Sequence, residues 1–162
     1  MLPPVFATGC FLARLEDKRT SVAASPPRVW ALLSHRAGES SQILALAEAL
    51  AWPYERKVMH YRWSAGAIGL IRVSASAGVA ARSRAELEPP WPDLLITSGL
   101  RNEPVARWIA AQSGGATRVV FIGRTWASVE HFDLLVTTPQ YRVTPAPRVL
   151  ENSTTLQAVT AE

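Results

Sequence analysis

Three short segments of the sequence each combine a glycine with an arginine directly after an apolar run, at residues 35–38, 99–102 and 123–124. Glycine lets a ligand approach the backbone, a helix N-terminus favours anions, and the arginine guanidinium presents a planar set of donors. These segments therefore predict contacts with an anionic ligand. The alternative interpretation is that each glycine is only a turn residue and each arginine is only solvated. The ligand-binding candidates on these segments are Arg36, Gly38, Gly99, Arg101, Asn102, Gly123 and Arg124.

His35 is the candidate catalytic residue, because it lies in the first segment and an imidazole can act as a general base near neutral pH. An unpartnered surface histidine is the alternative, and His60 and His131 have weaker claims. Ser98 resembles a nucleophile position only superficially, since the surrounding TSGLR lacks the G-x-S-x-G turn of hydrolases.

The motifs of common cofactor and metal sites are missing from the sequence. There is no G-x-G-x-x-G and no G-x-x-x-x-G-K-[ST]. The sequence therefore lacks the motifs that would best support a nicotinamide-dependent dehydrogenase or a P-loop enzyme. The histidines have no zinc-binding spacing, and a single cysteine cannot build a metal site. We expect neither a cofactor nor a metal.

The three segments follow strands in a chain that alternates strands with helices. Apolar runs predict strands within 28–33, 54–61, 93–99, 117–123 and 132–139. Helical spacing predicts a helix at 43–50, capped by Ser40 or Ser41, and another at 103–112. This alternation predicts an α/β fold with a doubly wound parallel sheet, Rossmann-like, in which ligands bind outside the carboxyl ends of the strands.

The chain of 162 residues, 48% of them hydrophobic, is long enough for one domain with a sizeable core. We expect a disordered tail over 1–27, a Rossmann-like domain over 28–152, and a C-terminal tail or truncated interdomain linker over 153–162. The N-terminal segment lacks the apolar core of a secretory signal. Cys10 is the only cysteine, so no intramolecular disulfide forms. A cytoplasmic location fits these features best.

Positive charge is concentrated in one stretch of a chain whose formal net charge is +4. Basic residues beside apolar ones can dock on an anionic membrane surface, which would place the protein at the periphery of the inner membrane. An ordinary connection over the sheet is the alternative, since the charges do not gather on one helical face. The cations of this stretch, which contains no acid, are Arg56, Lys57, Arg62, Arg72, Arg82 and Arg84.

Nucleic acid is not an expected partner, although the sequence contains six tryptophans. Trp30 falls within an expected strand and Trp108 within an expected helix. Core packing therefore explains them better than base stacking does.

Residues 28–152 resemble the N-terminal half of the mitochondrial fission family named after the plant elongated-mitochondria protein, in its bacterial branch. The most specific elements are Arg36-Ala37-Gly38 with Gln42, Arg101-Asn102-Glu103-Pro104, and Thr138-Pro139-Gln140-Tyr141. This resemblance adds Gln42 and Gln140 to the ligand-binding candidates. The first turn departs from the branch pattern, since Ser34 replaces a glycine and Ser40-Ser41 stand where an asparagine is usual.

The family is similar in design to GT-B glycosyltransferases, in which two Rossmann-like domains face each other. The resemblance implies that this chain is the acceptor-side half of such a protein and is inactive alone. It also implies that a nucleotide-sugar and sugar-acceptor system is the partner chemistry, and that a C-terminal domain or partner chain supplies the donor side. A noncatalytic binding or scaffold module, possibly at a membrane surface, is the alternative function.

Overall fold

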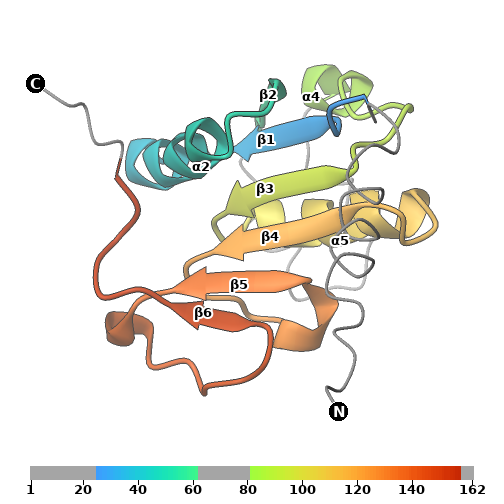
Figure 1. The fold of residues 1–162 in the computed structure, drawn as a ribbon. Coiled ribbons are helices and arrows are strands. Elements are labelled where there is room, and N and C mark those ends of the chain that lie inside the picture. Colours follow the sequence, from blue (N-terminus) through green and yellow to red (C-terminus); the bar gives the residue numbers. More distant parts are fainter. Residues whose placement is uncertain (1–24, 62–80, 158–162) are drawn as a thin grey trace, which may run out of the picture.

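The computed structural model describes residues 25–61 and 81–157. It contains a six-stranded sheet in the order β2-β1-β3-β4-β5-β6, and every neighbouring pair is parallel (Figure 1). The strands are β1 Val29–Leu33, β2 Tyr54–Val58, β3 Leu94–Ser98, β4 Arg118–Ile122, β5 Leu134–Thr137 and β6 Val149–Glu151. The helices are α2 Ala37–Ala49, α4 Ala81–Ala85 and α5 Asn102–Gln112, with single 3-10 turns η1 Val129–His131 and η2 Pro139–Tyr141.

The central strands form where short apolar runs can be buried on both sides of the sheet. β1 reads VWALL and is buried at its first four positions, and β3, β4 and β5 follow the same pattern with minor exposure. Such continuous apolar runs are typical of parallel strands covered by helices. β2 is an edge strand and carries charged, exposed residues, which discourage pairing with another chain.

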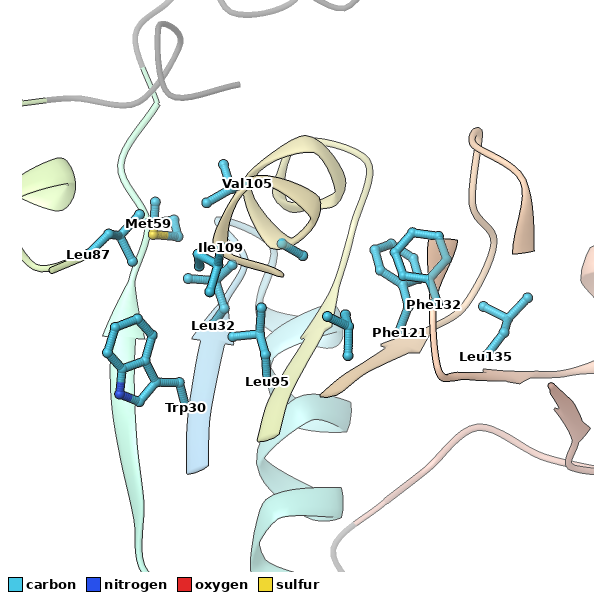
Figure 2. Close-up of a cluster of buried hydrophobic side chains, with 12 residues drawn as sticks. Trp30, Leu32, Met59, Leu87, Leu95, Val105, Ile109, Phe121, Phe132 and Leu135 are labelled. Atoms are coloured by element: carbon cyan, nitrogen blue, oxygen red, sulfur yellow. The ribbon is translucent and has the colours of Figure 1, made fainter. Parts of the chain in front are cut away.

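Helices cover both faces of the sheet, which confirms the doubly wound parallel arrangement. α2 packs on β1, β3 and β4, and α5 packs on β3 and β4 from the other side (Figure 1). Figure 2 shows the larger core, where α5 residues such as Val105 and Ile109 meet aromatic and aliphatic side chains of the sheet. A second, mainly aliphatic core that includes Ile43 lies under α2. The prediction that Trp30 and Trp108 pack in the core is confirmed, since both belong to the α5-side cluster or lie against it.

Two elements differ from the sequence-based expectation. α2 begins at Ala37, and neither Ser40 nor Ser41 caps it, because their hydroxyls donate to carbonyl groups of the preceding turn, Ser34 and Ala37. Serine inside a helix often bonds backward in this way. β6 was not predicted, because it is three residues long and follows a proline-rich loop. It pairs with β5 through backbone hydrogen bonds. Next to this pairing, the Leu135 N–H donates to the carbonyl of Arg148, the residue before β6, at 2.7 Å.

The expected N-terminal tail lies mainly outside the described residues, as does the chain beyond 157. In the part that is described, no helix has the length and hydropathy to cross a membrane.

Candidate functional site

The strand order reverses between β1 and β3, so their carboxyl ends open the crevice in which ligands bind to sheets of this kind. β1 continues through α2 to β2 on one side, whereas β3 continues through α5 to β4 on the other. The turns at 34–36 and 99–101 therefore flank this position. They contain His35, Arg36, Gly99 and Arg101, which the sequence predicted as site residues.

The turn after β1 is closed by its own side chains. Ser34 donates its hydroxyl to the Glu39 carboxylate and accepts the Arg36 N–H at 3.2 Å. Ser40 donates to the Ser34 carbonyl at 2.9 Å, and the Arg36 guanidinium lies 3.7 Å from the Glu39 carboxylate. Glu39 therefore lies in the first turn of α2 and neutralises part of the positive charge there.

Gly99 brings the turn after β3 against that first turn. It has a φ of +90°, and a Cβ at this position would overlap the Glu39 carboxylate. Its carbonyl accepts the N–H groups of Asn102 and Glu103 at 3.0 and 3.2 Å, which starts α5. Only glycine combines this backbone conformation with such a close approach. The two turns are thus in direct contact.

Asn102 has a buried side chain whose polar atoms are bonded within the protein. Its amide nitrogen donates to the Leu32 carbonyl and to the Thr97 hydroxyl, both at 3.0 Å, and its carbonyl oxygen accepts the Tyr61 hydroxyl. Asn102 thereby connects the ends of β1 and β3 to Tyr61, three residues after the end of β2. The prediction that it binds a ligand is untested, and its evident role is to position the turns.

Tyr61 is the residue around which the predicted site residues gather, and sequence reasoning missed it. The His35 ring packs edge-on against it at 6.5 Å between centroids, and the Arg101 guanidinium lies 6.0 Å from its centroid. Burial raises the pKa of Tyr61, so the phenol stays protonated and donates to Asn102. The sequence could have pointed to Tyr61, because it is an aromatic residue shortly after a predicted strand, at the edge of the sheet where ligands bind.

The turn after β4 is held by a buried carboxylate. Glu103 accepts the backbone N–H groups of Trp126 and Ala127, both at 2.8 Å. Gly123 has a φ of +103°, and its N–H donates to the Val136 carbonyl of β5 at 2.8 Å. Arg124 is exposed, and no described residue pairs with it. The Glu103 carboxylate therefore fixes the neighbouring loop after β4, which accounts for an acid at this position.

A shallow hollow lies beside this turn, at the carboxyl ends of β4, β5 and β6 and against α2. It is partly open to solvent, and the space that it offers to water-sized spheres is about 10 Å³, enough for about one water molecule. Gln42 and Gly123, both predicted site residues, line it together with Thr138 and Tyr141. Gln140 lies in η2 next to this hollow and is exposed.

The structure thus divides the predicted residues between two places. His35, Arg36, Gly99, Arg101 and Asn102 surround the β1/β3 crevice, whereas Gln42 and Gly123 line the hollow at β4 and β5. Gly38, Arg124 and Gln140 are exposed near these places. The Gly38 carbonyl accepts a hydrogen bond from the Gln42 carboxamide at 3.4 Å. The ligand-binding roles of all these residues stay predictions.

Ser98, His60 and His131 were the weaker candidates in the sequence. Ser98 is buried, and its hydroxyl donates to the Ile122 carbonyl at 2.8 Å, which links β3 to β4. His60 and His131 are exposed.

Much of the predicted cationic stretch lies outside the described residues, including Arg62 and Arg72. Of its described members, Arg56 lies against Tyr54, and Lys57 pairs with Glu55 at 3.0 Å and covers the Trp30 ring.

Chemically, the β1/β3 crevice combines two exposed guanidinium groups, one partly compensating carboxylate and an exposed imidazole. The N-termini of α2 and α5 point to the same edge, so the local field favours an anion. The His35 ring is exposed beside Tyr61, and no carboxylate pairs with it among the described residues.

Comparison with known proteins gives one family. Searches of curated proteins and of solved structures found no significant match. The model of the family described as mitochondrial fission ELM1 matches residues 37–162, which include the turn at 99–101 and the hollow but not the turn at 34–36. The resemblance seen in the sequence is therefore confirmed at the level of the family, and the chain belongs to the mitochondrial fission ELM1 family.

Proposed function

We propose that this chain is the acceptor-side half of a GT-B-like glycosyltransferase-related protein and that it binds its ligand at the β1/β3 crevice. The observation that carries the proposal is that His35 and Arg101 both contact Tyr61 at the switch point of a parallel sheet, with Arg36 in the same turn as His35. A crevice of this kind is the usual ligand position of a Rossmann-like domain.

The charges of the crevice favour a sugar that carries one phosphate or another single anion. Arg36 is partly compensated by Glu39, whereas Arg101 faces only the Tyr61 ring among the described residues. Arg101 is thus the group best placed to bind the anion, and His35 is placed to take a proton from a neighbouring hydroxyl. Because a transfer reaction needs donor and acceptor held together, we expect this domain alone to bind without turnover.

The test is a titration of the purified chain with glucose 1-phosphate and glucose 6-phosphate, followed by amide chemical shifts of the turns at 34–36 and 99–101. Replacing Arg101 with alanine should weaken binding by about 10- to 100-fold, the effect of losing a charge-assisted hydrogen bond. Its free energy of unfolding should change by less than about 0.5 kcal/mol, since Arg101 is an exposed turn residue.

Arg107→Ala is the matched control, because Arg107 is an exposed arginine on the same helix and has no partner among the described residues. Equal losses in the two variants would show only nonspecific charge effects and would contradict the proposal. Turnover of a nucleotide-sugar by the chain alone would contradict the expected inactivity.

A noncatalytic binding module is the second candidate, favoured by two apolar side chains at the same edge. Trp126 is 78% exposed and Leu100 is 49% exposed, on the turns that follow β4 and β3. Exposed aromatic residues on a fixed loop are frequent anchors in protein interfaces. A module of that kind would bind a protein partner but no hexose phosphate, so the same titration separates the two candidates.

A further inference from the structure

The side chain of Tyr61 has different partners at its hydroxyl and at its ring. The hydroxyl donates to the carbonyl oxygen of the buried Asn102 side chain. The ring packs against the α5-side core and contacts His35 and Arg101 at the crevice between β1 and β3. The hydroxyl therefore belongs to the interior of the protein, whereas the ring is shared with the candidate site.

The hydrogen bonds around Asn102 fix the Tyr61 hydroxyl as a donor. The Asn102 amide nitrogen donates to the Leu32 carbonyl, which can only accept, and to the Thr97 hydroxyl, both at 3.0 Å. The Thr97 hydroxyl in turn donates to the same Leu32 carbonyl at 3.0 Å. The Asn102 oxygen must therefore face Tyr61 and accept its hydrogen bond. The phenol proton is engaged there, so the hydroxyl is not an acid or base of the crevice.

The Tyr61 ring is the only partner of two crevice side chains within the part of the chain that the structure describes. The Arg101 guanidinium lies 6.0 Å from the centre of this ring, and the His35 ring centre lies 6.5 Å from it, edge-on. Neither side chain has a hydrogen bond or an ion pair to a described residue. A guanidinium is attracted to the face of an aromatic ring, and an edge-on ring pair is also favourable.

Contact with the ring lowers the entropy that Arg101 has left to lose when a ligand binds. An exposed arginine otherwise samples many rotamers, and ordering it during binding reduces affinity. The ring itself is held in place, because Asn102 connects its hydroxyl to the ends of both β1 and β3. His35 comes from the turn after β1 and Arg101 from the turn after β3. One anchored ring thus contacts a side chain from each turn.

We propose that Tyr61 is the positioning residue of the crevice, whose ring orders the Arg101 guanidinium and the His35 imidazole for an anionic ligand and whose hydroxyl only anchors the ring. This rests on the proposed function for the ligand, a phosphate ester, but the contacts to the ring do not depend on it. Two substitutions separate the parts of the side chain. Tyr61→Phe keeps the ring and removes the hydroxyl, whereas Tyr61→Leu removes both.

The first measurement follows side-chain NMR signals of the chain labelled with 13C and 15N, before any ligand is added. Protons near the face of an aromatic ring are shifted upfield. The Arg101 Cδ and Nε protons should therefore lie upfield of those of Arg107, an exposed arginine on the same helix, in wild type and in Tyr61→Phe. In Tyr61→Leu they should move to the Arg107 values, and the His35 ring signals should change as well.

The second measurement is a titration of the same three proteins with glucose 6-phosphate. Tyr61→Leu should bind about tenfold more weakly than wild type, because Arg101 must then be ordered during binding. Tyr61→Phe should bind within about threefold of wild type, since the ring is kept. Tyr61→Phe should nevertheless unfold at a lower urea concentration, because the buried Asn102 oxygen loses its donor. A purely structural role of Tyr61 would instead make binding fall with stability in both variants.

Three results would overturn the proposal. These are an absence of the Arg101 upfield shift in wild type, Arg101 signals that stay the same in Tyr61→Leu, and equal loss of binding in the two variants. If Tyr61→Leu does not fold, the wild-type shift and the Tyr61→Phe titration still decide. If glucose 6-phosphate does not bind wild type, the proposed function fails, whereas the Arg101 and His35 signals still decide whether Tyr61 positions them.

Discussion

Gly99 illustrates how a single residue fixes the geometry of the candidate crevice. Its φ of +90° is a conformation that side chains of L-residues rarely adopt, and the space where a Cβ would lie is filled by Glu39. Glu39 in turn accepts the hydroxyl of Ser34 and lies near Arg36. A methyl group at position 99 would therefore disturb both turns at once.

We expect Gly99→Ala to lower the free energy of unfolding by about 2 kcal/mol or more, because backbone strain and overlap with Glu39 act together. Gly38→Ala is the matched control, since Gly38 lies in α2 and a Cβ there would meet no atom within 4 Å. The control should leave stability unchanged or raise it by up to about 1 kcal/mol. Urea unfolding measures both variants, and equal behaviour would show that position 99 tolerates a side chain.

At the scale of elements, a few long-range side-chain bonds place the turns that the strands bring to one edge. Glu103 joins the start of α5 to the loop after β4, and Asn102 joins α5 to the ends of β1 and β3. Asp133 joins the start of β4 to the residue before β5. Its carboxylate accepts the Val119 N–H at 2.9 Å and a guanidinium N–H of Arg118 at 2.8 Å. These bonds connect elements far apart in the sequence.

Asp133 gives a pH-dependent prediction for the contact between β4 and the start of β5. Partial burial opposes ionisation of Asp133, but hydrogen bonds from Val119 and Arg118 outweigh it and lower its pKa below 3.8. A lowered pKa in the folded state means that the ionised group stabilises the fold above pH 3.8, and this stability is lost as the pH falls through the folded-state pKa. Asp133→Asn should therefore cost most near neutral pH and little below pH 3.

Because Asp133 is partly exposed, we expect the difference at neutral pH to be no more than about 1 kcal/mol. Glu130→Gln is the control, since its exposed carboxylate has no partner among the described residues. Urea unfolding between pH 2.5 and 7 measures the effect. A difference between wild type and Asp133→Asn that does not change with pH would contradict this account.

The sequence predicted those elements whose signal is local. The strands β1, β3, β4 and β5 were predicted because a strand buried on both faces has a continuous apolar sequence, which can be recognised without knowing its neighbours. The start of α2 was placed too late because serine can either cap a helix or bond backward within it. β6 was missed because three residues carry almost no local preference and pair only once β5 is in place.

The same distinction applies to the candidate site. Glycines and arginines after strands could be predicted to share one edge, because parallel strands end together. Tyr61 could not be assigned, because its significance depends on partners that only the folded chain defines. The division of the predicted residues between a crevice and a hollow likewise follows from strand order, which no local pattern specifies.

At the scale of the whole molecule, one sheet separates two cores of different composition. The core on the α5 side contains large aromatic residues, among them Trp30, Phe121 and Phe132 (Figure 2). The core under α2 is built from smaller aliphatic residues such as Val29 and Ile96. Since alternate residues of the same strands supply both cores, the two faces should unfold together as one cooperative unit.

A pair of matched substitutions tests this arrangement. Ile43 of α2 and Ile109 of α5 are both fully buried, and they lie in the cores on opposite faces of the sheet. Figure 1 shows the two helices, and Figure 2 shows Ile109. Each Ile→Val change should lower the free energy of unfolding by about 0.5–1.5 kcal/mol, because one buried methylene is lost. The double variant should lose the sum of the two within about 0.5 kcal/mol, since the residues share no partner across the sheet. Urea unfolding followed by circular dichroism and by tryptophan fluorescence should give one coincident transition in all three variants. Trp30, Trp91 and Trp108 pack together on the α5 side, so their fluorescence reports on that core. A separate transition in Ile43→Val would show that the two faces fold independently.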